Sequence, residues 1–144
     1  MKIGVDLGGT NIRAGLIDGK EIINAKAIPL QYKEDLENTL EQLKSIIHTV
    51  FKNGVKGIGL GVPSIVDLEK GIVRDVVNIP SWKEVPLRDI LEKEFNVPVF
   101  INNDSNCFAL GENYFGFGQQ HQNFVGITLG TGIGSGIIIE DKIY

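Results

Sequence analysis

The residues best suited to chemistry near the start of the chain form the run 6–11 (DLGGTN). Glycines allow a tight turn between two strands to bring backbone N–H groups against an anion. Thr10 and Asn11 add side-chain donors, and Arg13 on the following strand can reach the same anion. Asp6, at the end of the first strand, can hold Mg²⁺ through water. The run predicts a phosphate-binding hairpin, and the alternative is an ordinary glycine turn.

A second glycine-rich run occupies residues 129–136 (LGTGIGSG) and exposes backbone along one face. A dinucleotide-binding fingerprint is the obvious alternative, but no G-x-G-x-x-G fits. Ser135 stands three residues beyond Gly132, and Ile137 stands three residues beyond Gly134. The pattern that follows is a strand rather than the helix that such a fingerprint requires. The run therefore predicts a second strand–turn–strand unit.

A third candidate is the run 102–106 (NNDSN), between a predicted strand and a predicted helix. A carboxylate at a helix N-terminus is stabilised in its ionised form by the helix dipole. At the carboxyl end of a strand it also faces the usual ligand crevice of an α/β sheet. An ionised Asp104 can accept a proton from a substrate hydroxyl that attacks a phosphorus centre. The alternative is plain N-capping by Asn103 or Asp104.

Two further loops, 61–64 (GVPS) and 78–82 (NIPSW), carry polar and aromatic groups. Such groups suit the face of a sugar, whereas the alternative is turn chemistry together with a core tryptophan, Trp82. The sequence leaves both interpretations open.

The elements that must position these runs are predicted from a change of hydrophobic period along the chain. Strands are expected over 2–8, 11–17, 21–30, 56–62, 97–101, 123–130 and 133–140, with a small hairpin pairing 65–66 with 71–73. A helix of about 20 residues follows Leu36, ends at Asn53 and uses Gly54 as a left-handed cap. Shorter helices are expected from Pro86 to Phe95 and from Asn103 to about Tyr114.

The chain also contains an internal repeat. A shift of 122 positions lays residues 3–10 over residues 125–132, and both copies read as strand, Gly/Thr turn and strand. Chance similarity of two glycine-rich hairpins is the alternative. Otherwise the chain holds one complete βββαβαβα unit, residues 1–117, and the first hairpin of a second unit, residues 118–144. A chain of this kind is expected to be truncated at Tyr144.

Composition limits the classes of function. The chain has 144 residues, a net charge of −4, 42% hydrophobic and 22% charged residues, and no Lys/Arg cluster, so nucleic-acid and membrane partners are not expected. Cys107 alone cannot form an intrachain disulfide, and with only His48 and His121 it makes no recognisable zinc site. No signal-peptide pattern and no apolar run of roughly 18 residues is present, which predicts a soluble, cytoplasmic α/β protein.

Taken in order, these runs resemble the ROK family of sugar kinases, and the glucokinases in particular, over the whole chain. The resemblance is carried by 6–11 (DLGGTN), 61–63 (GVP), 78–82 (NIPSW), 103–112 (NDSNCFALGE) and 130–134 (GTGIG). It implies the fold of the actin/hexokinase superfamily: an α/β ribonuclease-H-like domain with a mixed sheet, plus the first hairpin of a second such domain. It also implies ATP with Mg²⁺ as phosphoryl donor and a hexose, most often glucose, as acceptor.

The resemblance further implies roles for individual residues. Asp104 is the general base that activates the 6-hydroxyl of the sugar. The substrate-binding positions are Ser64, Asn78, Asn103 and Asp104, and the nucleotide-binding positions are Asp6, Gly8, Gly9, Thr10, Asn11, Arg13, Gly130, Thr131, Gly132 and Gly134, with Asp6 also on Mg²⁺. A homodimer is expected.

Three departures from the family pattern stand out. Ser64 and Ser135 occupy positions where the family commonly has glycine. A later motif with a sugar-binding Glu and His and a zinc-binding Cys cluster is missing, so a structural zinc is expected only in that missing part, which also holds most of the adenosine pocket. The isolated chain is therefore expected to be a weak or inactive kinase.

Two other functions stay open. The ROK family includes sugar-responsive transcriptional repressors, which carry a helix-turn-helix domain before the first glycine hairpin. Here the hairpin begins at residue 4, which is expected to leave no room for that domain, and the acidic balance disfavours DNA binding. The third possibility is a non-catalytic sugar-binding fragment.

Overall fold

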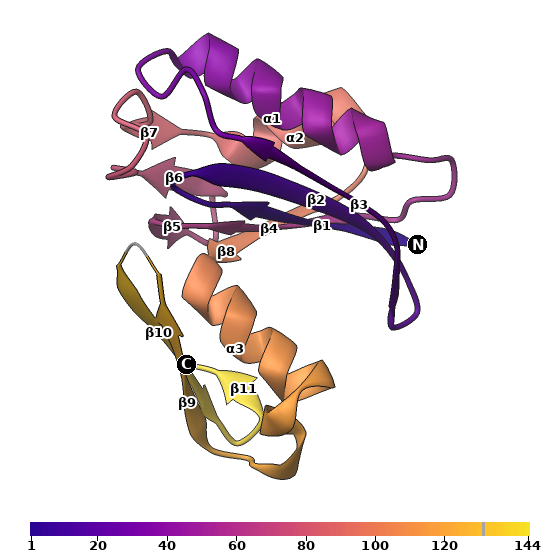
Figure 1. The fold of residues 1–144 in the computed structure, drawn as a ribbon, viewed down its shortest axis with the longest axis vertical. Helices are drawn as coiled ribbons and strands as arrows, with labels where there is room; N and C mark the ends of the chain where they lie inside the picture. The colour runs from indigo at the N-terminus through magenta and orange to yellow at the C-terminus, as the bar shows by residue number, and fades with distance from the viewer. Residues whose placement is uncertain (131) are drawn as a thin grey trace.

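The computed structural model describes residues 1–130 and 132–144 and contains three β-sheets (Figure 1). The main sheet has five strands in the order β3-β2-β1-β4-β8, namely β1 (Lys2–Leu7), β2 (Asn11–Asp18), β3 (Glu21–Pro29), β4 (Ile58–Val62) and β8 (Val99–Asn103). A small sheet contains β5 (Ile65–Asp67), β6 (Ile72–Arg74) and β7 (Glu84–Val85), and a third contains β9 (Phe124–Leu129), β10 (Ile133–Ile139) and β11 (Lys142–Ile143). The helices are α1 (Leu36–Val50), α2 (Leu87–Phe95) and α3 (Asp104–Phe115), followed by the short 3₁₀ helix η1 (Phe117–Gln120).

The main sheet is mixed, as the sequence predicts. β1 pairs with β2 antiparallel, whereas β1, β4 and β8 run parallel to one another. The register sets Asp6 beside Gly61, and Gly61 beside Asn102. Because the carboxyl ends of parallel strands meet at one edge of a sheet, three of the candidate runs come together there. These are the turn after β1, the loop after β4 and the start of α3.

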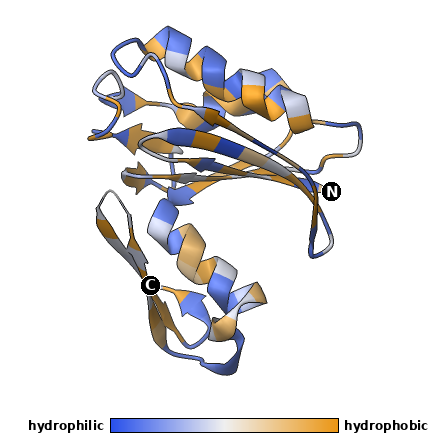
Figure 2. Cartoon of the chain, viewed as in Figure 1, coloured by the Kyte–Doolittle hydropathy of each residue, from blue (hydrophilic) through white to orange (hydrophobic). Residues whose placement is uncertain are grey.

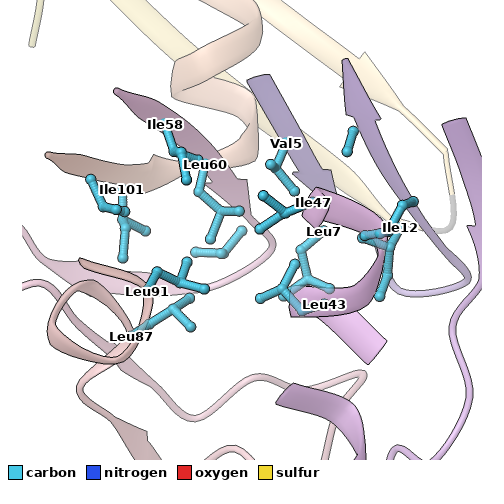
Figure 3. Close-up of a cluster of buried hydrophobic side chains, with 14 of the residues drawn as sticks. Val5, Leu7, Ile12, Leu43, Ile47, Ile58, Leu60, Leu87, Leu91 and Ile101 are labelled. Carbon is cyan, nitrogen blue, oxygen red and sulfur yellow. The ribbon is translucent and has the colours of Figure 1, made fainter. Parts of the chain in front are cut away.

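One face of the main sheet is covered by α1 and α2 (Figure 1). The hydrophobic core lies between this face of the sheet and the two helices (Figure 3). Leu43 and Ile47 on α1 and Leu91 on α2 are completely buried against it. Apart from Leu36, the exposed residues of α1 are polar or charged, and blue bands mark this helix in Figure 2. The exposed residues of α2 are Asp89, Lys93 and Glu94. Trp82 is also completely buried, so the core interpretation of this tryptophan is correct.

The prediction for the end of the first helix is wrong. α1 has 15 residues and ends at Val50, with Phe51 as its C-cap at φ −70° and ψ 135°. Gly54 has a left-handed φ of 90° but lies in a later turn and does not cap the helix. The Phe51 ring packs against Phe95 with ring centroids 5.3 Å apart, and we infer that this tertiary contact draws the backbone out of the helix.

The start of α1 carries a pH-dependent cap. Asp35 Oδ1 accepts a hydrogen bond from the Asn38 N–H at 3.0 Å, and this bond holds the pKa of the Asp35 carboxyl below its ordinary value of 3.8. Since the folded pKa lies below the unfolded one, the cap stabilises the fold above the unfolded pKa and loses that effect as pH falls through the folded pKa.

We therefore expect Asp35→Asn, which keeps a capping acceptor, to flatten the acid side of the stability curve. Calorimetric melting at pH 7 and near pH 3 should show a smaller acid-induced fall in Tm than in the parent protein. Glu34→Gln removes a neighbouring exposed carboxylate and is the control. An equal fall in Tm in the parent and in Asp35→Asn would contradict the assignment.

The second glycine hairpin lies on the other side of the main sheet, together with α3 (Figure 1). β9 and β10 pair antiparallel, so the predicted strand–turn–strand unit is confirmed. The repeat is inexact at the turn, because Leu7 pairs with Ile12 across four residues and Leu129 pairs with Ile133 across three. The division into residues 1–117 and 118–144 stays a prediction.

The two hairpins bury opposite faces. Ile3, Val5 and Leu7 lie in the core under α1 and α2, whereas Val125 and Ile127, which match the first two in the repeat, are 56% and 59% exposed. α3 instead covers the glycine-bearing face of β9 and β10.

None of the helices in the described residues has the length and apolar character needed to span a membrane.

Candidate functional site

A cavity of about 1010 Å³ lies where the carboxyl ends of β4 and β8 meet the turn between β9 and β10. All four predicted substrate-binding residues, Ser64, Asn78, Asn103 and Asp104, line it. Of the predicted nucleotide positions, its wall contains Gly9, Gly130, Gly132 and Gly134, whereas Asp6, Gly8, Thr10, Asn11 and Arg13 lie outside that wall. Thr131 falls outside the described residues.

Asp104 is the first residue of α3, and Asn103 is its N-cap. Asn103 Oδ1 accepts hydrogen bonds from the N–H groups of Ser105 at 2.9 Å and Asn106 at 3.3 Å. The capping and general-base interpretations are therefore compatible, because they fall on neighbouring residues. Asn103 satisfies the helix terminus, and the carboxylate of Asp104 is held at the cavity wall where the helix dipole favours its charge.

The loop after β4 is hydrogen-bonded to the start of α3. Asn103 Nδ2 donates to the backbone oxygen of Ser64 at 3.4 Å. The Ser64 hydroxyl in turn donates to the Arg74 carbonyl on β6. This bond is one that glycine, common at this position in the family, could not make. Ser64 therefore attaches the β5–β6 hairpin to the end of β4.

The first glycine hairpin is a tight turn in which the Gly8 N–H donates to the Asn11 carbonyl at 2.9 Å. A Cβ atom on Gly9 would lie 2.7 Å from Asn78 Nδ2, so glycine at this position lets Asn78 approach the turn closely. Lys33 Nζ donates to the Gly9 carbonyl at 2.6 Å and adds a positive charge beside the turn. The sequence interpretation missed Lys33, because it follows β3 in an irregular segment without any local motif.

Asp6 and Arg13 face each other across the β1–β2 pair, with Arg13 Nη1 2.8 Å from Asp6 Oδ2. The guanidinium thus contacts the carboxylate, an arrangement that the sequence did not predict. Among the described residues, no group of three His, Cys, Asp or Glu side chains could enclose a metal ion. Mg²⁺ usually keeps several waters and binds through one or two carboxylates plus substrate phosphates, so one carboxylate can be enough. Of the two Asp6 oxygens, Oδ2 is the one that contacts Arg13, and Oδ1 is the one that fits such a site.

The pKa of the Cys107 thiol is affected by the carboxylates at this edge of the sheet. Burial, and after it the carboxylates of Asp104 and Asp6, raise the pKa of the Cys107 thiol above its ordinary value. The thiol is therefore neutral near pH 7. Both carboxylates lie near enough to Cys107 to disfavour its thiolate, so Asp6 and Asp104 belong to the same edge of the sheet.

Gly134, at the start of β10, packs against the start of α3. A Cβ atom on Gly134 would collide with the Ser105 hydroxyl and lie 2.7 Å from Thr128 Oγ1. Gly130 and Gly132 have open space around them, which leaves backbone exposed at the cavity. Ser105 and Thr128 were not singled out from the sequence, because their proximity arises only when β9 packs on α3.

The main sheet is mixed, α3 starts at the carboxyl ends of its parallel strands, and a second glycine hairpin follows α3. This arrangement defines a ribonuclease-H-like protein of the actin/hexokinase superfamily. The model of the ROK family matches residues 2–144, and the chain belongs to this family.

Named relatives agree with this assignment. A glucokinase of Thermotoga maritima is 41% identical over 140 residues, which cover 94% of this chain and 44% of the relative. A xylose repressor of Caldicellulosiruptor bescii is 37% identical over 149 residues, which cover 99% of this chain and 37% of the repressor. The crystal structure of a ROK glucokinase of Streptomyces griseus with glucose and AMPPNP matches with a TM-score of 0.90 and 35% identity, over 99% of this chain and 46% of that one. The chain thus spans less than half the length of these relatives.

Proposed function

We propose that the protein is an ATP-dependent sugar kinase that transfers the γ-phosphoryl group to the 6-hydroxyl of a hexose, with glucose as the first candidate. The observation that carries the proposal is that one cavity is lined both by Asn78, Asn103 and Asp104 and by Gly130, Gly132 and Gly134. The similarity to a glucokinase crystallised with glucose and AMPPNP supports it.

Asp104 acts as the general base in this proposal. Its carboxylate accepts the proton of the attacking hydroxyl, which contributes a factor of about 10²–10⁴ to the rate. Asn103 and Asn78 orient the sugar from neighbouring loops. Placing the hydroxyl in line with the phosphorus supplies a further large part of the acceleration.

The two glycine turns supply backbone N–H groups to the phosphates, with Thr10 and Asn11 as side-chain donors. Lys33 keeps its ammonium beside the first turn through the Gly9 carbonyl. Asp6 is the residue that would hold Mg²⁺, through water. When bound, that ion neutralises the charge developing on the phosphate oxygens.

A sugar panel tests the proposal. The intact protein is assayed with ATP and glucose, mannose, fructose, N-acetylglucosamine, N-acetylmannosamine or xylose, in a coupled assay that detects ADP. We expect phosphorylation of at least one hexose, strongest with glucose, and none with AMPPNP. Failure to phosphorylate any hexose, with the fold intact, would contradict the proposal.

The core of a sugar-responsive repressor is the second candidate, and the similarity to xylose repressors favours it. It predicts sugar binding without turnover. Xylose binding by calorimetry with no ADP formation, together with a specific operator shift at low salt, would reverse the ranking.

A further inference from the structure

The hydroxyl of Ser105 lies between the candidate base and the second glycine loop. Ser105 is only 3% exposed, and its Oγ is 3.3 Å from Asp104 Oδ1 and 3.1 Å from Thr128 Oγ1. Asp104 and Ser105 belong to the first turn of α3, whereas Thr128 belongs to β9, which runs directly into the loop. A buried hydroxyl thus contacts both the start of α3 and strand β9, two elements that line the cavity.

The direction of these bonds follows from the donors available. An ionised carboxylate only accepts, so the Ser105 hydroxyl donates its single proton to Asp104 Oδ1, and Thr128 donates to Ser105. The Ser105 N–H also donates to Asp104 Oδ1, at 2.7 Å. Asp104 Oδ1 therefore receives two hydrogen bonds from Ser105. Within the described part of the chain, Asp104 Oδ2 receives none, which leaves that oxygen for a substrate hydroxyl.

Gly134, the second residue of β10, packs against this pair of hydroxyls. Any side chain at Gly134 would occupy the space taken by the Ser105 hydroxyl and would press on Thr128. The contact is close because β10 brings Gly134 beside Thr128 in the β9–β10 register. The position of the start of β10 and the orientation of the Asp104 carboxylate are therefore linked through two hydroxyl groups.

We propose that Ser105 is a positioning residue, which together with Thr128 holds the Asp104 carboxylate with Oδ2 facing the cavity and links that orientation to Gly134 at the start of β10. The inference rests on the proposed function, since it assigns Ser105 a role in presenting the base. It requires no contact between Ser105 and the sugar or the nucleotide.

The test compares Ser105→Ala with a matched pair on the partner strand, Thr128→Val and Thr128→Ser. Three-bond NMR couplings in the intact protein measure the χ1 rotamers of Asp104. We expect one dominant rotamer in the parent and in Thr128→Ser, and a smaller population of that rotamer in Ser105→Ala and Thr128→Val, in which the bond from the Ser105 N–H remains. In the intact protein, kcat for the best hexose should fall about three- to tenfold in these last two variants while KM for the sugar stays unchanged.

These readouts separate two failures. An unchanged Asp104 rotamer in both Ser105→Ala and Thr128→Val overturns the positioning role, whatever the protein phosphorylates. If the rotamer changes as expected but no hexose is bound or phosphorylated, the proposed function fails while the hydroxyl link stands. If Ser105→Ala does not fold, the Thr128→Val and Thr128→Ser pair still decides, since valine and threonine are nearly isosteric. A rise in KM with constant kcat would assign Ser105 to sugar binding and contradict the proposal.

Discussion

Asp104→Asn is expected to lower the rate of hexose phosphorylation by about 10²–10⁴-fold while glucose affinity stays within about twofold. Asparagine has nearly the same shape, and its amide oxygen can still accept the Ser105 N–H, which in the parent lies 2.7 Å from Asp104 Oδ1. What it loses is the ability to take up the proton of the attacking hydroxyl. Calorimetric glucose binding and initial rates with saturating ATP, both on the intact protein, measure the two effects separately.

Asp75→Asn is the matched control, because Asp75 also lines the cavity and undergoes the same change of charge. Asp75 has a left-handed φ of 45°, a conformation that asparagine tolerates well. We expect its rate within about threefold of the parent, since no role in proton transfer is assigned to it. Retained turnover in Asp104→Asn, or an equal loss in Asp75→Asn, would contradict the assignment of the base.

Gly136→Ala is expected to destabilise the fold by about 1–3 kcal/mol, as overpacking of a close interface does. The new Cβ would lie 2.6 Å from Ala109 Cβ and 2.6 Å from the Ser105 backbone oxygen. Neither atom can rotate away, so β10 and α3 must separate. Urea unfolding of the parent and the variant measures the change, and sugar binding should weaken because α3 carries Asp104 at its start.

Gly111→Ala is the contrasting control on the same helix. A Cβ atom at Gly111 meets nothing within 4 Å, and the residue lies inside α3. Alanine costs less chain entropy than glycine in a helix, so this variant should gain about 0.5–1 kcal/mol of stability. Equal effects of the two substitutions would show that the packing between α3 and β10 is looser than the structure indicates.

Much of the candidate site follows from local sequence signals. The glycine pair after β1 and the acidic residue after β8 are predicted from neighbouring residues, because strand periods, turn residues and helix starts are encoded within a few positions. The parallel pairing of β1, β4 and β8 then brings Asn103 and Asp104 to the same edge as the end of β1. The ordered motifs added the family, which the comparison with the ROK model confirms.

The first helix shows where local signals lose to packing. Its hydrophobic period runs to Val50, where the helix ends, but the turn residues Asn53 and Gly54 placed the predicted end three residues later. Phe51 leaves the helical path and packs against Phe95 of α2. Turn residues along one segment contain no information about where a second helix offers a contact that ends the first helix earlier.

The sequence by itself thus determined the mixed α/β fold, the two glycine turns and the identity of the candidate base. Only the tertiary structure decided the ion pair of Asp6 with Arg13, the approach of Lys33 to Gly9, and the Ser105 hydroxyl between Asp104 and Thr128. The physical reason is that these contacts join different strands, helices and loops. Their partners are chosen by sheet register and by the packing of α3, and no spacing along the chain encodes either.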